Sequence, residues 1–67
     1  MLRETLARNL RRTRISLGLT QEALAEECGL HQTYISDIER ARRNVTLDVI
    51  QRLSIALEVK PEELLSD

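Results

Sequence analysis

Hydrophobic residues recur at spacings of three and four along residues 2–17, the repeat of one face of an α-helix. The side chains on this face are Leu2, Leu6, Leu10, Thr13 and Leu17. Gly18 follows, and a glycine just past a helix readily takes the left-handed conformation that ends it. The pattern predicts a first helix over residues 2–17 that buries this face.

Two short helices are predicted on either side of Gly29. Thr20 can cap the first, over residues 21–28, because its hydroxyl can accept a hydrogen bond from a free N–H of the first turn. The second covers residues 32–40. The side chains expected to face the core are Leu24, Ala25 and Cys28 on the first helix, Leu30 in the turn, and Ile35 and Ile38 on the second.

The remaining residues predict a polar loop over residues 41–45 and two more helices. Thr46 is placed to cap the fourth helix, and Pro61 to open a short fifth one, since proline is favoured at the first helical position. The side chains of the fourth helix expected to be buried are Leu47, Ile50, Leu53 and Leu57. No segment has the alternation of a strand. We therefore expect an all-α, compact five-helix fold and a single domain over residues 1–67.

Residues 20–40 have the features of a helix-turn-helix, in which two short helices meet at a sharp angle. Ala25 is small enough for a close crossing, and Gly29 can adopt the turn conformation. The exposed face of the second helix carries short polar side chains, namely Gln32, Thr33, Ser36 and Asp37. The major groove of DNA admits one helix, and such side chains can hydrogen-bond to base edges. The segment therefore indicates DNA binding.

The formal net charge of −1 by itself disfavours nucleic acid, but the charges are unevenly distributed. Residues 1–17 carry +4 and residues 30–44 carry +1, whereas residues 18–29 and 45–67 each carry −3. Nine of the ten cations are arginine, which favours bidentate recognition of phosphate or guanine. The molecule is thus polarised, with cations flanking the predicted DNA-binding unit.

Other classes of protein are disfavoured by what the sequence lacks. No apolar run is long enough for a transmembrane helix, and the first residues do not form a signal peptide. Cys28 is the only cysteine and cannot form an internal disulfide, so we expect a cytoplasmic protein without membrane contact. Cys28 and His31 are too few to form a structural zinc site, and Glu26 and Glu27 are interpreted as solvated acids. We expect no enzyme, no metal and no cofactor.

The chain resembles the phage-repressor-like (Cro/repressor, or XRE-type) helix-turn-helix family. The resemblance is carried by residues 19–25, 29–30, 34–40, 53–57 and 61–65. Within this family the chain is most similar to the controller proteins of restriction–modification systems, through residues 29–36 and 39–47. The resemblance implies a repressor-like domain and a transcriptional regulator.

The resemblance also implies roles for individual residues. Gln21 would hold a DNA phosphate and support the first residue of the recognition helix, which is the predicted helix over residues 32–40. The bases would be faced by Gln32, Thr33, Ser36 and Asp37, and the DNA backbone by Arg42, Arg43 and Asn44. Arg14 and Glu39 match a pair that forms a structural salt bridge. Most members have glycine in place of Ala41, and alanine is disfavoured in the left-handed conformation, so the reach of the following arginines depends on this loop.

Three residues of this segment are open to two interpretations each. Asp37 can accept a hydrogen bond from cytosine N4, or it can be a local acceptor or ion-pair partner. His31 can cap the recognition helix or contact a base or phosphate. Tyr34 can pack at the edge of the core or touch DNA. All three are therefore kept among the candidate DNA-binding residues.

The last two helices look more apolar than one small core requires. The side chains that cannot all point at one small core are Ile55, Leu57, Val59, Leu64 and Leu65. We infer a two-fold homodimer through this region, with recognition helices roughly 34 Å apart on a near-palindromic operator in double-stranded DNA. In the family that the chain resembles, an acidic patch at the end of the second helix can contact RNA polymerase, which makes polymerase a further expected partner.

The sequence thus predicts a sequence-specific transcriptional regulator, with control of a restriction–modification operon as the finer expectation. The alternative is an antitoxin-like module that binds a partner protein and autoregulates. Such modules usually carry an extension that binds the toxin, and this sequence ends two residues past Leu65 without one. A dimerising scaffold with no DNA role is the third hypothesis.

Overall fold

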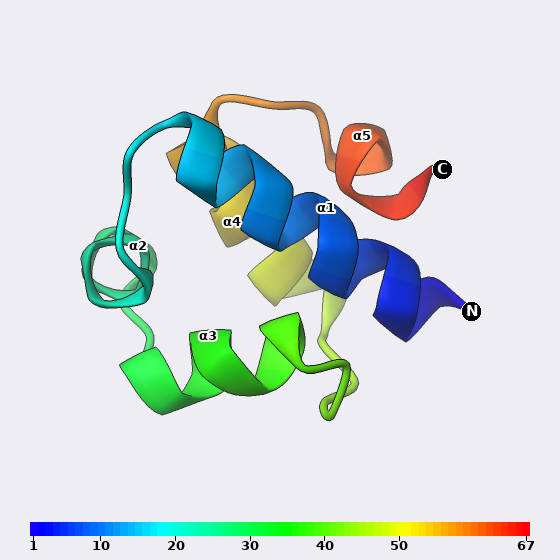
Figure 1. The fold of residues 1–67 in the computed structure, drawn as a ribbon, viewed down its shortest axis with the longest axis horizontal. Coiled ribbons are helices and arrows are strands. Elements are labelled where there is room, and N and C mark those ends of the chain that lie inside the picture. The colour runs from blue at the N-terminus through cyan, green and yellow to red at the C-terminus, as the bar shows by residue number, and fades with distance from the viewer.

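The computed structural model describes all residues 1–67 and contains five α-helices and no strand. The helices are α1 (Leu2–Ser16), α2 (Gln21–Cys28), α3 (Gln32–Glu39), α4 (Leu47–Leu57) and α5 (Pro61–Leu65). In Figure 1, α1 runs across α4, α3 lies along one edge of the molecule, and α5 packs beside the first half of α1. The predicted all-α, five-helix fold is confirmed.

The helix ends show why these segments are helical. The Thr20 hydroxyl accepts a hydrogen bond from the Ala23 N–H at 3.0 Å, which satisfies a free donor of the first turn of α2. Thr46 does the same for α4, accepting from the Val49 N–H at 3.1 Å. Gly29 takes the left-handed conformation, with φ of 68°, at the end of α2. These three predictions are confirmed.

His31 lies at the N-cap position directly before α3, as predicted, but its side chain makes no capping hydrogen bond. The capping interpretation of His31 is therefore wrong for this structure. The imidazole is exposed beside the first turn of the recognition helix. Its other interpretation, a contact to DNA, stays a prediction.

The core is built from aliphatic side chains of all five helices. The largest side chains with almost no exposed surface are Leu10, Leu24, Ile35, Ile38, Leu53, Leu57 and Leu64. Tyr34, which is the only aromatic residue, is half-buried at the edge of this core. The core thus holds α3 by its two isoleucines and leaves the opposite face of that helix at the surface.

Three leucines that periodicity predicts to be buried are exposed. Leu2, Leu17 and Leu47 have exposed fractions of 65%, 51% and 85%. Each lies at an end of its helix, where no neighbouring helix covers it. Val49 is buried in the first turn of α4 instead, at 8% exposure. Periodicity identifies the inward face of a helix but does not show how far the covering helices extend.

A buried polar side chain, Asn9, joins α1 to α5. Its amide nitrogen donates to the Leu64 carbonyl at 3.0 Å and to the Ser66 carbonyl at 2.8 Å. Its side-chain oxygen accepts from Arg12 at 2.8 Å, and Asn9 is only 1% exposed. Asp67 adds a contact at the surface, where its carboxylate accepts a hydrogen bond from Arg8. This hydrogen bond lowers the pKa of the Asp67 carboxyl. Asn9 therefore satisfies carbonyls that would otherwise be free at the end of α5.

Candidate nucleic-acid interface

The crossing of α2 and α3 places the recognition helix at the surface. Ala25 is 2% exposed and lies in the core, where a small side chain permits close approach of the helices. The chain turns at Gly29, and the Leu30 N–H donates to the Ala25 carbonyl at 2.9 Å. Ile35 and Ile38 then fix α3 on the core with at most 1% exposure. This arrangement is the helix-turn-helix that the sequence predicts.

The outer face of α3 brings most of the predicted base-facing residues together. Gln32 and Thr33 are exposed in its first turn, whereas Ser36 and Asp37 are half-buried one turn later. Tyr34 is also half-buried, so its ring lies between the core and the surface. In Figure 1, α3 lies along one edge of the molecule.

A nearly buried ion pair attaches the end of α3 to α1. The Glu39 carboxylate accepts hydrogen bonds from Arg14 Nε at 2.7 Å and Arg14 Nη2 at 3.0 Å. The side chains of Arg14 and Glu39 are 12% and 4% exposed. The hydrogen bond to Glu39 raises the pKa of the Arg14 guanidinium, although burial acts in the opposite direction. The predicted structural pair is present.

Gln21 joins this pair from the start of α2. Its side-chain nitrogen donates to Glu39 Oε1 at 3.1 Å. The observed partner is therefore the last residue of α3, whereas the family resemblance implies support of Gln32 at its start. Gln21 is half-buried at the N-terminus of α2, where backbone N–H groups favour an anion. Contact of Gln21 with a phosphate stays a prediction.

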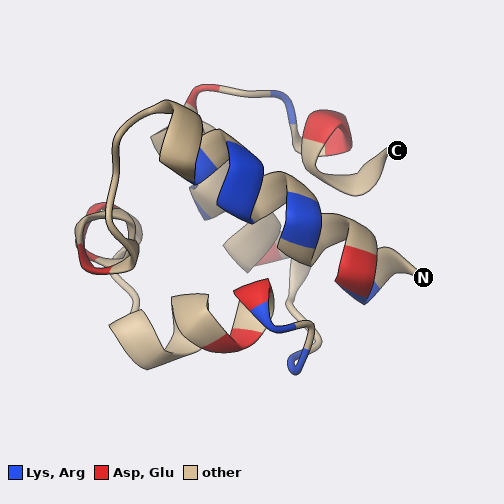
Figure 2. Ribbon diagram, viewed as in Figure 1, with Lys and Arg blue, Asp and Glu red and all other residues tan.

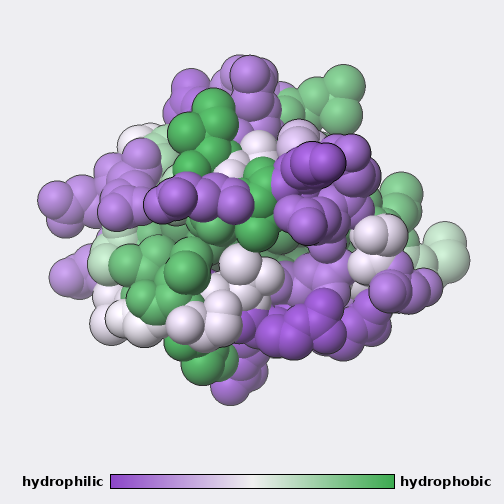
Figure 3. Space-filling model, turned by 90° about the horizontal axis from the view of Figure 1, so that it is seen from above, coloured by the Kyte–Doolittle hydropathy of each residue, from purple (hydrophilic) through white to green (hydrophobic).

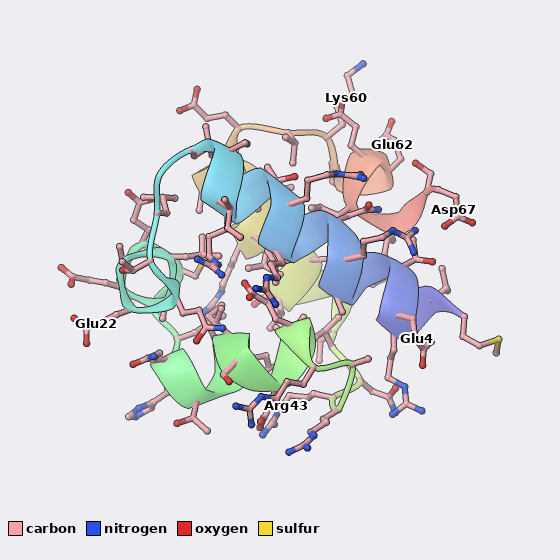
Figure 4. The ribbon with its side chains drawn as sticks, in the orientation of Figure 1. Glu4, Glu22, Arg43, Lys60, Glu62 and Asp67 are labelled. Atoms are coloured by element: carbon pink, nitrogen blue, oxygen red, sulfur yellow. The ribbon has the colours of Figure 1, made fainter.

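The loop after α3 takes the left-handed turn even though it lacks glycine. Ala41 has φ of 58°, and the Arg42 N–H donates to the Asp37 carbonyl at 2.9 Å. The turn returns the chain toward α3, as Figure 4 shows for Arg43. Arg43 Nη2 lies 3.4 Å from Asp37 Oδ2, and its guanidinium carbon lies 4.4 Å from the Tyr34 ring centroid. Of the two interpretations of Asp37, the ion-pair partner is the one seen in this structure.

One cation beside this loop is missing from the sequence-based site. Arg3, in the first turn of α1, lines a groove together with Arg43 and Asn44. Forty residues separate Arg3 from these loop residues in sequence, so no local motif could have revealed the proximity. Arg3 adds a positive charge next to the predicted backbone contacts of Arg42, Arg43 and Asn44.

The charges on the surface are segregated by element. Figure 2 shows Lys and Arg along most of α1 and on the loop after α3, and Asp and Glu on α2, α3 and α5 and near the start of α1. Glu22 extends from α2 into solvent, away from Arg43 (Figure 4). The two acids of α3 are each paired with an arginine, Glu39 with Arg14 and Asp37 with Arg43. The net negative charge of the chain is therefore not concentrated on the recognition face.

The exposed apolar surface differs from the predicted dimer surface. Leu57 and Leu64 are 2% and 1% exposed and belong to the core, so neither side chain is available to an interface. Ile55 remains 68% exposed on α4. A second apolar area lies at the other end of the molecule, around the groove that Arg3 lines. Its hydrophobic residues are Leu2, Leu6, Val45, Leu47, Ile50 and Leu65.

The face seen in Figure 3 carries separate apolar patches, with hydrophilic side chains between them.

Cys28 is a buried free thiol whose sulfur lies 3.8 Å from the Arg52 carbonyl oxygen, and burial raises the pKa of this thiol. No group of three or more His, Cys, Asp or Glu side chains is placed to hold a metal ion. None of the helices combines the length and apolar character needed to cross a membrane.

Comparison with known proteins agrees with this geometry. A helix-turn-helix family profile matches residues 10–64. The control protein C.BamHI of Bacillus amyloliquefaciens is 51% identical over 65 residues, which cover 96% of this chain and 80% of that protein. Its name is that of a regulator and not of an enzyme, and the same is true of the two solved structures described next.

Two solved structures have the same fold. A hypothetical transcription factor from Neisseria superposes with a TM-score of 0.95 at 44% identity, covering 98% of this chain and 76% of that one. The restriction–modification controller protein C.AhdI of Aeromonas hydrophila has a TM-score of 0.89 at 40% identity, covering 92% and 94% of the two chains. The chain belongs to the helix-turn-helix family and has restriction–modification controller proteins among its relatives.

Proposed function

We propose that this protein is a homodimeric transcriptional regulator that binds a near-palindromic operator and controls a restriction–modification operon. One observation carries the proposal. The exposed face of α3 is polar, and both of its acids, Asp37 and Glu39, are paired with arginines. This helix can therefore approach phosphates without an unpaired negative charge. The controller proteins among its relatives support the finer part of the proposal.

In the proposed complex α3 lies in the major groove. Gln32 can make a bidentate contact to adenine, and Thr33 and Ser36 can reach neighbouring base edges or a thymine methyl group. The remaining contacts, mainly to the DNA backbone, are assigned to Gln21, His31, Tyr34, Arg42, Arg43 and Asn44, and we include Arg3 because it lines a groove with Arg43 and Asn44. Phosphate contacts give affinity and position, whereas base contacts give specificity.

A randomised duplex library, selected on the protein and sequenced, tests sequence-specific binding. We expect one enriched motif with two related halves separated by about one helical turn. Gln32→Ala should lose roughly 1–3 kcal/mol of discrimination at one base pair in each half. Arg42→Ala should weaken binding to all sequences alike and lower the salt dependence by about one ion. Recovery of no motif by the unmodified protein would refute the proposal.

We assign the dimer surface to the apolar area around Leu47 rather than to the C-terminal end of α4. Leu47 is 85% exposed and Leu2 is 65% exposed, and burial of each side chain would stabilise a dimer by about 1.5–3 kcal/mol. This area adjoins the loop that follows α3, because Val45 and Asn44 line the same groove. A two-fold axis there would relate the two recognition helices by symmetry, as a near-palindromic site requires.

Sedimentation equilibrium tests this assignment. Leu47→Glu should yield monomers, whereas the control Ile55→Glu, on the other exposed part of α4, should leave the dimer intact. Dissociation by Ile55→Glu alone would show that the assignment is wrong.

The proposal also places the protein in the cytoplasm with its operator. It assigns contact with RNA polymerase to the exposed acids of α2, which are Glu22, Glu26 and Glu27.

A further inference from the structure

We propose that Asp37 is a positioning residue that holds the guanidinium of Arg43 against the recognition helix for contact with a DNA phosphate. The inference rests on the proposed function, since it assumes that α3 enters DNA. It assigns Asp37 a role different from the direct cytosine contact considered from the sequence.

The geometry of Arg43 carries the proposal. The left-handed Ala41 reverses the chain after α3, and Arg43 then lies against two side chains of that helix. Asp37 holds one terminal nitrogen at 3.4 Å, and the Tyr34 ring supports the guanidinium carbon at 4.4 Å. An ion pair and a cation–π contact on the same group restrict an otherwise flexible side chain. Asp37 and Tyr34 therefore form a seat for the guanidinium, which we call the Arg43 seat.

The seated guanidinium can still bind a ligand. A guanidinium has five N–H donors, and the only hydrogen bond formed by the Arg43 side chain uses Nη2. Arg43 is 44% exposed, whereas its partner Asp37 is 27% exposed. The free donors are thus available to an oxygen anion beside the recognition helix. In a complex with α3 in the major groove, the anions nearest to this guanidinium would be the phosphates that border the groove.

The electrostatics of Asp37 give the proposal a sign that can be measured. An unpaired carboxylate on α3 would repel phosphates, whereas a carboxylate that seats Arg43 favours DNA binding. Replacement of Asp37 by asparagine should therefore have opposite effects in the presence and absence of Arg43. Neither a direct base contact nor simple repulsion predicts such a reversal.

The experiment is a double-mutant cycle on the selected operator, read by fluorescence anisotropy at several salt concentrations. Asp37→Asn should weaken operator binding roughly threefold in the otherwise unmodified protein; together with the opposite effect expected without Arg43, the coupling is about sixfold, near the upper end for an exposed ion pair. In the Arg43→Ala background the same substitution should tighten binding about twofold. Arg43→Ala alone should lower the salt dependence by about one ion.

Matched controls distinguish the Arg43 seat from a general charge effect. Asp48 pairs with Arg52 at 3.2 Å on the exposed surface of α4, so Asp48→Asn removes the same charge away from the recognition helix. It should leave operator binding within twofold. Tyr34→Leu removes the ring beneath Arg43 and should weaken binding. Circular dichroism establishes that each variant is folded.

Three results would overturn the inference. Tighter binding by Asp37→Asn in both backgrounds would mean that the carboxylate only repels DNA or that it withholds Arg43 from it. Weaker binding in both backgrounds, with loss of preference at one base pair, would mean that Asp37 contacts the base itself. If the unmodified protein selects no operator, the proposed function fails. If it selects one and Asp37→Asn has no effect, only this inference fails.

Discussion

Removal of the Glu39 carboxylate should strongly destabilise the protein, because Glu39 connects α3 to Arg14 of α1 and Gln21 of α2. Three hydrogen bonds end on this carboxylate, two from Arg14 and one from Gln21, and all are between 2.7 and 3.1 Å. Glu39→Ala would leave a guanidinium that is only 12% exposed without its counter-charge. Breaking a buried pair from one side costs about 3–5 kcal/mol.

The size of the chain makes this loss severe. A domain of 67 residues has a free energy of unfolding of roughly 3–10 kcal/mol. Since 1 kcal/mol shifts Tm by about 4–8 °C in a domain of this size, Glu39→Ala should lower Tm by about 15 °C or more. Urea unfolding followed by circular dichroism measures the same loss as a lower midpoint with an unchanged slope. Protein concentration must be held constant, because dimerisation would contribute to stability.

A second variant separates charge burial from loss of packing. In Arg14→Met with Glu39→Leu both charges are absent, and a buried ion pair can often be replaced by apolar side chains at little cost. We expect this double variant to be more stable than Glu39→Ala. The exposed pair gives the control, because Asp48→Asn should cost less than about 1 kcal/mol. Two outcomes would refute the reasoning. One is a Glu39→Ala variant whose free energy of unfolding lies within about 1 kcal/mol of that of the unmodified protein, and the other is a double variant that is less stable than Glu39→Ala.

Three further predictions concern local features of the fold. Ala41→Gly should raise the free energy of unfolding by about 0.5–1 kcal/mol, because relief of the left-handed alanine outweighs the greater freedom of glycine in the unfolded chain, whereas Ala56→Gly inside α4 should lower it; equal effects in urea titrations would contradict this account. Thr20→Ala should cost about 1 kcal/mol through loss of the α2 cap and Thr20→Ser much less, and a neutral alanine variant would count against the cap. Cys28 should resist alkylation in the folded state. Because burial raises its pKa, only the unfolded chain ionises as pH rises above about 8.5, so the free energy of unfolding should fall there and Cys28→Ala should abolish that slope; a slope that persists in the variant would exclude the thiol as its cause.

The local rules of the sequence predict most of the fold. Thr20, Thr46 and Gly29 mark helix ends because their chemistry acts on backbone groups within one turn. Ile35 and Ile38 face the core because a helix packed on one side needs apolar side chains at that spacing. The recognition face follows directly, since it is the opposite side of the same short helix.

The features that were missed depend on contacts between distant residues. Leu47 has the right helical spacing to be buried, but whether another helix covers it depends on where that helix ends. Arg3 joins the site only because α1 begins beside the loop that holds Arg43. The sequence offers an ion pair as one of two roles for Asp37 but does not identify Arg43 as its partner, because the pair forms only after Ala41 reverses the chain. Periodicity and motifs contain no information about these distances.

The contacts of Asn9 with the last helix have a consequence for the order of folding. They join residues 54 to 57 positions apart, so their formation closes most of the chain into one loop. Loop closure over such a distance is entropically unfavourable and gains little until the intervening helices have packed. Docking of α5 should therefore be a late event, and its amides should exchange with solvent before those of α2 and α3. Leu65, on the same helix, belongs to the apolar area around Leu47 that we assign to the dimer. A second copy seated there would retain α5 in place, so that completion of the monomer and assembly of the dimer become one coupled equilibrium.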